Sequence, residues 1–488
     1  MIPSTTCIRR MLAAGLLCVL GAGIGAFRAA AQPTPDTIRV TLTEAVQRAL
    51  DVSPEVDRRR AQQRFAEARR EQAQANRFLT DLSLDIASSF APGLDNVPPG
   101  TPEDELYLDP DVTNDWSPGA LRPFGRAEAV ARQPIFTWGE LSGTIDAARH
   151  GVDVETARVD QKALEVAART GELYYNLLLT QALARLAERT ADVVDRAQKE
   201  IQRLLDKGDE SVDQADLFQT RITEEEVKRR TVEVEQNRAT ARSALRRQLF
   251  LSDGTVVQAT SEELTPLTSP LHPDSLDHYI TLGLKNRPEV EQAQAGVRAR
   301  KAQVDVAKSN YYPKIGVQAS LSQGVTLPDR PNPSNPFVGD SFMGTGTRTG
   351  LGITLDLNFQ QTAAKVEQAQ AELSEVKQQQ TAARQLVRFE VEEAYRNVIV
   401  AEAKMESRDR ANKISGEWLR TEQIDFDLGF GDTENLVKAV RADIEAEARY
   451  FEAVKAYNVA VLKLLRTTGT LTDRIRNGTL VDTTSTQK

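Results

Sequence analysis

The chain has 488 residues, of which 27% are charged and 40% are hydrophobic, and its formal net charge at pH 7 is −9. Beyond residue 31, no apolar run is long enough to form a transmembrane helix. An acidic chain is repelled by phosphate backbones, so this charge argues against nucleic acid as a partner.

The N-terminus has the pattern of a secretory signal peptide. Two arginines precede an apolar run at residues 11–24, and the small residues Ala29-Ala30-Ala31 offer a cleavage site. Removing residues 1–31 with their three arginines would change the formal charge from −9 to −12. Both cysteines, Cys7 and Cys18, lie in this segment, so we expect no disulfide and no thiolate metal site in the mature chain.

Two helical patterns open the predicted mature chain. A short amphipathic pattern begins at Leu42, and after a break a longer one follows with Pro54 near its first position. Adding 234 to these numbers finds the same arrangement again, at Leu276 and Pro288. The chain is therefore predicted to contain a direct repeat, with residues 32–250 as the first copy and 275–469 as the second.

Four stretches alternate between apolar and polar residues. They lie at about 80–90, 125–136, 314–323 and 347–359, and each predicts a strand of roughly ten residues with one apolar face, as in outer-membrane barrels. A pair of soluble antiparallel hairpins would show the same alternation. The apolar positions are Leu82, Leu84, Ile86 and Phe90; Ala127, Ala129, Ala131 and Ile135; Ile315, Val317, Ala319 and Leu321; and Leu351, Ile353, Leu355, Leu357 and Phe359.

Long connections separate the strands of each predicted pair. Residues 91–122 are rich in Pro, Gly and Asp, and residues 324–346 are rich in Pro, Asn and Gly. Compact domains seldom carry such loops, whereas membrane barrels do. Aromatic residues near the strand ends would suit interfacial belts: Phe90, Trp116, Phe124, Phe136, Trp138, Tyr311, Tyr312, Phe342 and Phe359.

The longest periodic segments, residues 139–250 and 361–468, follow the strands and predict two helical hairpins. Apolar residues recur every seven positions from Ile145 to Leu173, which predicts a coiled-coil seam. About 68 residues at 1.5 Å rise would form a rod on the order of 100 Å. The second hairpin follows from the first at an offset of 221 without insertion or deletion, since Glu172, Tyr174, Asn176 and Gly208 become Glu393, Tyr395, Asn397 and Gly429.

Four strands cannot close a membrane barrel alone, because the smallest barrels have about eight. Unpaired strand edges are not tolerated in lipid, so a membrane-spanning form of this chain must oligomerise. The long helices would then continue the barrel as a tube. The linker at residues 251–274 and the tail at 470–488 have no assignable role.

The order of these elements resembles the TolC-like outer-membrane efflux proteins. The resemblance covers Leu42 to about Gly469 and rests on the duplicated Pro-Glu-Val segments, the order helix, two strands and helical hairpin given twice, and the tip Phe426-Asp427-Leu428-Gly429. It implies a homotrimer with a twelve-stranded β-barrel in the outer membrane and an α-helical tunnel in the periplasm. It also implies a passive exit duct for efflux or type I secretion, served by a periplasmic adaptor protein and an inner-membrane transporter.

The same resemblance implies two sets of functional residues. The adaptor would contact the hairpin tips, at Gly208, Asp209, Ser211, Val212, Leu428, Gly429, Phe430, Gly431 and Asp432. The helix leaving the second tip would line the periplasmic aperture, where relatives carry two aspartates and this chain has Asn435 and Lys438, with Glu434 nearby. Alternatively, Lys438 points outward and pairs with Glu434 at i, i+4.

Motifs that would support an enzyme are weak. The three histidines, His150, His272 and His278, read as surface residues. The acidic loop from Asp109 to Asp115 mimics the start of a calcium loop but lacks its turn glycine and its bidentate glutamate. We therefore expect no catalytic, metal or cofactor site. The alternative to a transport duct is a periplasmic coiled-coil scaffold with soluble β-hairpins.

Overall fold

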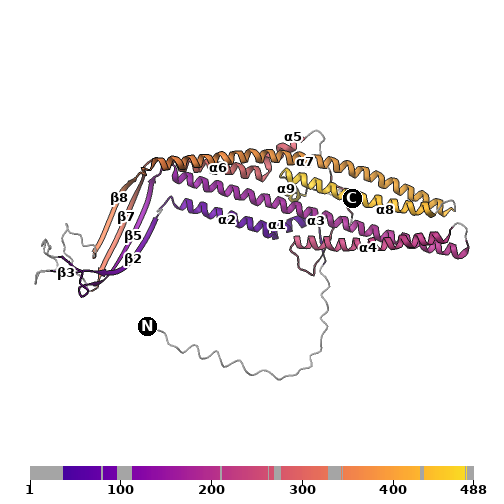
Figure 1. The fold of residues 1–488 in the computed structure, drawn as a ribbon, viewed down its shortest axis with the longest axis horizontal. Helices are drawn as coiled ribbons and strands as arrows, with labels where there is room; N and C mark the ends of the chain where they lie inside the picture. The colour runs from indigo at the N-terminus through magenta and orange to yellow at the C-terminus, as the bar shows by residue number, and fades with distance from the viewer. Residues whose placement is uncertain are drawn as a thin grey trace, which may run out of the picture.

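The computed structural model describes residues 37–78, 81–95, 113–208, 212–261, 263–268, 276–327, 342, 344–428, 433–478 and 480. The predicted signal peptide and the middle of both long loops lie outside these residues. The molecule is elongated, with four strands at one end and a bundle of long helices running away from them (Figure 1). Among the described helices, none has both the length and the apolar composition needed to cross a bilayer.

The four predicted strands form one antiparallel sheet in the order β2-β5-β7-β8. The strands are β2 (Asp81–Ala91), β5 (Arg122–Phe136), β7 (Lys314–Thr326) and β8 (Gly344–Thr354). The pairing of β5 with β7 joins the two repeats in one sheet. A smaller sheet pairs β3 (Gly93–Asp95) with β4 (Thr113–Asp115) beyond the end of β2.

The fourth strand ends earlier than its alternation predicts. It stops at Thr354, so Leu355 and Leu357 lie outside the sheet, and the following helix already begins at Phe359. Between them, the backbone N–H of Asn358 donates to Oδ1 of Asp356 at 3.0 Å. Side chains of this kind stabilise turns by bonding the backbone two residues on, and this local turn ends the strand although the apolar alternation continues.

Four helices continue from the sheet side by side. They are α2 (Pro54–Ala75), α3 (Glu140–Lys207), α6 (Pro288–Ser309) and α7 (Phe359–Asp427), and α3 packs against both α2 and α6 while α7 packs against α6. With 68 and 69 residues, α3 and α7 are each about 100 Å long, which confirms the predicted rods. Pro54 occupies the first turn of α2 after the N-cap Ser53, as predicted.

The far halves of α3 and α7 pair with shorter returning helices. These are α4 (Gln214–Gln248) and α8 (Thr433–Thr467), which complete the two predicted hairpins. Gly208 ends α3 with φ of 71°, a left-handed conformation that favours glycine, and its N–H bonds the carbonyl of Leu205 at 3.0 Å. Asp213 and Asp216 form a capping box that starts α4.

The main hydrophobic core lies midway along the helices. Here α1 (Leu42–Val52), α5 (Leu276–Asn286), α9 (Leu471–Arg476) and the parallel pair of β1 (Thr37–Val40) with β6 (Val256–Ala259) surround the rods. The linker without a predicted role thus supplies β6. Buried Asn458 ties the linker to α8, because it accepts from the N–H of Leu267 at 2.8 Å and donates to the carbonyl of Thr265 at 2.9 Å.

Candidate functional site

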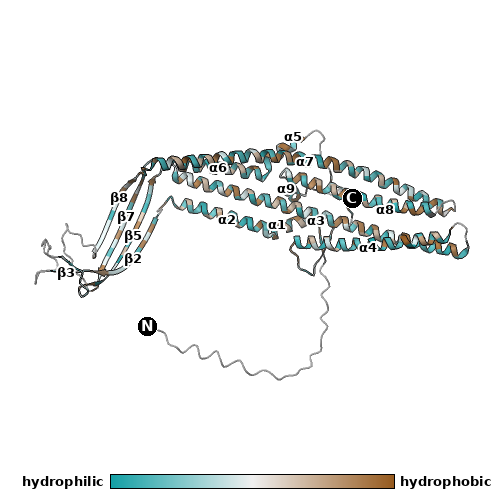
Figure 2. Ribbon diagram, viewed as in Figure 1, coloured by the Kyte–Doolittle hydropathy of each residue, from teal (hydrophilic) through white to brown (hydrophobic). Residues whose placement is uncertain are grey.

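One face of the four-stranded sheet is apolar and uncovered. The register places Leu82, Leu84 and Ile86 of β2 opposite Ala131, Ala129 and Ala127 of β5, and the apolar row continues through Ala319 and Leu321 of β7. The three β2 side chains are 66 to 76% exposed. Figure 2 shows the alternation of hydrophobic and hydrophilic residues along these strands. A continuous row of exposed apolar side chains indicates contact with lipid or with another protein.

The opposite face of the sheet carries the charges. Arg132 of β5 pairs with Asp81 of β2 and also donates to Gln318 of β7 at 3.4 Å. Arg126 and Glu128, two residues apart on β5, form a further ion pair at 3.1 Å. In the wall of a water-filled membrane barrel, one face of the sheet is apolar and contacts lipid, and the other is polar and contacts water. This sheet has the same two kinds of face.

Each of the two outer strands has one edge that no other strand of the described residues pairs with. The sheet ends at β2 on one side and at β8 on the other, so each presents unpaired backbone N–H and C=O groups. Such edges cost several kcal/mol per group in a bilayer and invite pairing with another chain in water. The apolar face and the open edges together indicate that this sheet is incomplete in one copy of the chain.

Aromatic residues gather at both ends of the sheet, as predicted. At the helical end, Trp138 stacks on Tyr312 with ring centres 4.9 Å apart, contacts Phe136 at 4.8 Å, and donates its indole N–H to the carbonyl of Pro313 at 2.7 Å. At the loop end, Phe342 contacts Trp116 and Phe124. Aromatic side chains that carry a polar group, such as Trp and Tyr, are typical of the two ends of an apolar band, where a membrane meets water.

The hairpin tips form the opposite end of the molecule, but the structure describes only part of each. Gly208 ends α3 on the surface, whereas Val212 is buried against Ile201 and Leu217 between α3 and α4. Leu428 is 64% exposed at the end of α7. The other predicted contact residues, Asp209, Ser211, Gly429, Phe430, Gly431 and Asp432, lie outside the described residues.

At the predicted aperture, Lys438 pairs with Glu434 on the surface of α8. The Nζ of Lys438 lies 2.6 Å from Oε1 of Glu434, and both side chains are more than half exposed. This hydrogen bond lowers the pKa of Glu434 below its ordinary value. Asn435 lies beside them, also exposed. The i, i+4 pair that was the alternative to an aperture lysine is therefore present, and whether Lys438 lines a passage remains a prediction.

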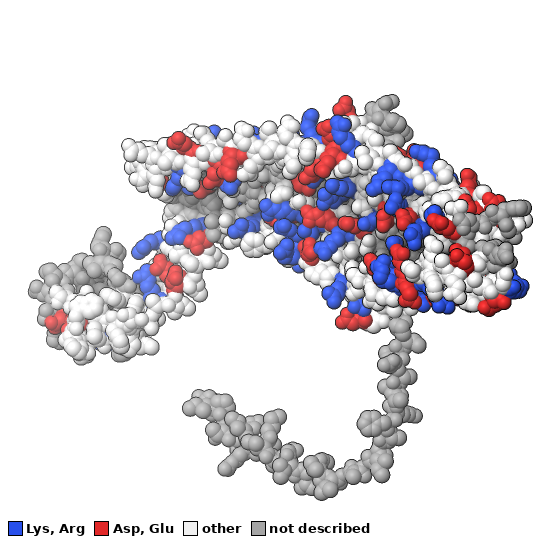
Figure 3. All heavy atoms as spheres, turned by 45° about the vertical axis from the view of Figure 1, so that its right-hand side comes forward, with Lys and Arg blue, Asp and Glu red and all other residues white. Residues whose placement is uncertain are grey.

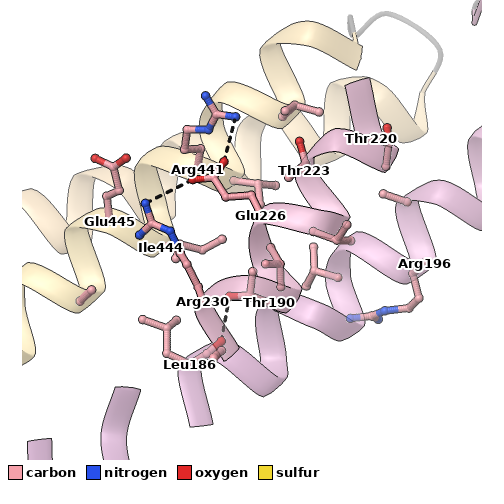
Figure 4. A pocket seen from close by; sticks show the side chains of 18 of the residues that line it. Leu186, Thr190, Arg196, Thr220, Thr223, Glu226, Arg230, Arg441, Ile444 and Glu445 are labelled. Atoms are coloured by element: carbon pink, nitrogen blue, oxygen red, sulfur yellow. Dashed lines mark hydrogen bonds and ion pairs between the residues drawn. The ribbon is translucent and has the colours of Figure 1, made fainter. Parts of the chain in front are cut away.

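Sequence reasoning missed a cavity of about 810 Å³ between the two hairpins. Apolar residues of α3, α4 and α8 line it, including Leu186, Val194, Val227 and Ile444. Figure 4 shows Arg230 and Arg441 converging on Glu226 at its mouth, at 3.3 and 4.0 Å. Heptad periodicity predicted the seam within each hairpin, but not the space that the two hairpins enclose between them. Elsewhere on the visible face of the helices, acidic and basic side chains are interspersed (Figure 3).

Metal chemistry has no support in the described part of the chain, where no group of three or more His, Cys, Asp and Glu side chains is close enough to hold an ion. His150 pairs with Asp153 at 3.0 Å on α3, and His278 lies against the ring of Tyr279. His272 and the acidic loop from Asp109 to Asp111 lie outside the described residues.

Comparisons with known proteins agree with this arrangement. A family model described as outer membrane efflux protein matches residues 125–249 and 280–470. Among solved structures, a membrane protein from Pseudomonas aeruginosa is similar with 16% identity and a TM-score of 0.67, covering 88% of this chain and 93% of its own. No curated protein matches the chain.

Two further solved structures show the same fold. The outer membrane protein VceC of Vibrio cholerae has 16% identity and a TM-score of 0.66, with 88% of this chain and 96% of that chain covered. The open state of the MtrE outer membrane channel of Neisseria gonorrhoeae has 15% identity and a TM-score of 0.66, with 88% and 89% covered.

Proposed function

The chain belongs to the outer membrane efflux protein family, and from this premise we propose that it forms the outer-membrane exit duct of a tripartite efflux or type I secretion system. The observation that supports this most directly is the four-stranded sheet, with one apolar face, one charged face and two open edges. Substrate would pass through passively, because the family is one of channel proteins rather than enzymes.

The dimensions of the chain fit a duct. The four strands have 11 to 15 residues, enough for tilted strands that cross a bilayer. The rods of about 100 Å would extend the passage into the periplasm. In the alternative, a soluble scaffold, the apolar face of the sheet would be exposed to water. Soluble proteins rarely expose an apolar surface of this kind.

We further propose three copies, each adding four strands to a ring of twelve. The open edges require at least one other copy, and eight strands from two copies would already close a small barrel. Three copies give a wider ring, which leaves room for a water-filled lumen, whereas small barrels are filled by side chains. The repeat boundaries at 32–250 and 275–469, joined by the linker 251–274, are part of the same proposal.

At the periplasmic end, we propose that the hairpin tips bind an adaptor protein connected to an inner-membrane transporter. Leu428 supports this, because it is a large apolar side chain left in water at the end of α7. In the same arrangement, Glu434, Asn435 and Lys438 surround the narrowest part of the duct. The adaptor and transporter would supply the energy and the substrate.

A pair of neighbouring substitutions on the central strand β7 tests the duct. Leu321 lies on the apolar face near the middle of β7, and Ser322 lies on the charged face opposite Glu128. Leu321→Arg should destabilise the membrane-inserted oligomer by about 2–4 kcal/mol, because the charge would sit in lipid. Ser322→Arg should be tolerated, because the new cation faces water and Glu128.

The measurements are the yield of folded oligomer in the outer-membrane fraction and the conductance of the purified protein in planar bilayers. The proposal expects wild type and Ser322→Arg to sediment with the outer membrane and to conduct. Equal loss of oligomer in both variants would contradict the assignment of the two faces. Release of wild type from membranes by salt alone would favour a scaffold.

A further inference from the structure

The internal repeat shows how one copy of the chain would meet the next. Adding 221 converts α3 into α7, and adding 234 converts α2 into α6. Within the chain, the first repeat meets the second where α3 packs on α6 and β5 pairs with β7. By the same relation, α7 of one copy should pack on α2 of the next copy. The contacts inside the chain therefore serve as a template for the contact between copies.

The best-defined contact in this template is aromatic. Trp138 and Tyr312 stack with ring centres 4.9 Å apart, at the point where the sheet meets the helices. Adding 221 to Trp138 gives Phe359, and subtracting 234 from Tyr312 gives Phe78. Both counterparts are aromatic, and neither contacts another ring among the described residues, with Phe78 75% exposed and Phe359 48% exposed.

A second contact agrees with the first. Gly143 of α3 lies so close to α6 that an added Cβ would come within 2.8 Å of Val306 and 3.2 Å of the carbonyl of Ala302. The counterpart of Gly143 is Ala364 on α7, and the counterpart of Ala302 is Ala68 on α2. Both alanines are exposed in one copy. Small residues on both edges leave room for a close approach of the two helices.

We propose that Phe78 of one copy stacks on Phe359 of the next, and that this contact joins neighbouring copies where the sheet meets the helices. The inference rests on the proposed oligomeric duct and specifies which edges meet. The occupant is a second copy of this chain, because the template consists of the chain's own two repeats. An exposed ring near a bilayer could instead lie among lipid headgroups, and the experiment separates these two environments.

Cysteine crosslinking tests the contact in the full-length protein. The only cysteines of the chain are Cys7 and Cys18, so Cys7→Ala and Cys18→Ala provide a cysteine-free background. In that background, Phe78→Cys with Phe359→Cys, treated with a short bismaleimide in outer membranes, should give covalent species of two and three chain masses. Each single variant should remain at one chain mass.

Two control pairs calibrate the result. Trp138→Cys with Tyr312→Cys should crosslink within one chain, and so leave the mass unchanged while protecting both thiols from later labelling. Phe65→Cys with Phe359→Cys should not crosslink, because Phe65 lies 10 residues before Ala75, the last residue of α2, and is therefore about 15 Å along the helix from the end beyond which Phe78 lies. The number of copies is measured separately by light scattering of uncrosslinked protein in detergent.

The outcomes distinguish the contact from the duct itself. A trimer by light scattering that gives no crosslinked species from the Phe78 and Phe359 pair would overturn the contact and leave the proposed duct standing. Labelling of both thiols by a lipid-soluble maleimide in that trimer would place the rings in the membrane instead. A monomeric wild type would overturn both proposals.

Discussion

The two long helices α3 and α7 are copies of each other, yet they are buried to very different extents. They have 68 and 69 residues and match at a constant offset of 221. Helix α3 lies in the interior, with α2 and α6 on either side near the sheet and α4 and α8 near the tips (Figure 1). Helix α7 is at the edge, where α6, the short helix α5 and then α8 pack against it.

Equivalent positions of the two helices therefore differ in their exposed fraction. Leu178 of α3 is 2% exposed, whereas its counterpart on α7, Ile399, is 46% exposed. The apolar side chains of Phe389, Val400 and Ile414 are also exposed along α7. A helix that keeps large apolar residues along an uncovered side is typical of a subunit interface. In the proposed oligomer, this uncovered side of α7 is the surface that another copy would cover.

The largest expected effect comes from the pair that defines this comparison. Leu178→Ala should lower the free energy of unfolding by about 2–5 kcal/mol, because it leaves a cavity in the main core. Ile399→Ala should change the unfolding of the single chain little, but should shift the balance from oligomer to monomer. Denaturant titration and light scattering in detergent measure the two effects. If Leu178→Ala and Ile399→Ala lowered the free energy of unfolding equally, the two positions would be equally buried and the comparison would be wrong.

The tips offer a second contrast, because Leu428 is the counterpart of Lys207. Leu428→Lys would make the second tip resemble the first, and should abolish adaptor binding and export while the oligomer stays intact. Phe250→Asp, which removes an exposed apolar side chain at the opposite end of α4, is the matched control and should leave adaptor binding unchanged. Co-purification of the adaptor checks this. Recovery of the adaptor at wild-type yield with Leu428→Lys would contradict the role of this tip.

The smallest expected effect concerns Lys438, whose counterpart Leu217 is buried between α3 and α4. If Lys438 lines the aperture, wild type should resist block by multivalent cations, and Lys438→Asp should create that block. Single-channel recordings at neutral pH check this. The hydrogen bond to Lys438 lowers the pKa of Glu434 from its ordinary value of 4.5, so the Glu434 carboxylate is charged at neutral pH. The ion pair with Lys438 is therefore lost only when the pH falls below that ordinary value. Unchanged cation sensitivity would place Lys438 off the passage.

The elements with a strong local period could be predicted from the sequence. The alternation around Leu82 and Ile86 predicted β2, and the heptads from Ile145 onward predicted α3. The parallel pair of β1 and β6 was missed, because each strand has only four residues and their partners, such as Thr37 and Val256, are far apart in the chain. The end of β8 was misplaced because the turn at Asp356 outweighs the alternation.

The candidate site divides in the same way. Its residue types, with apolar and charged faces on the strands and glycine at the first tip, follow from local sequence, because side-chain direction alternates in a strand and glycine favours a left-handed turn. The burial of Leu178 and the exposure of Ile399 do not follow from local sequence, because these equivalent positions of the two repeats carry equally apolar residues. Which of them is covered depends on neighbouring helices from distant parts of the chain. The sequence by itself determined the repeated elements and their faces, and only the tertiary structure decided which repeat lies inside and which edge is open.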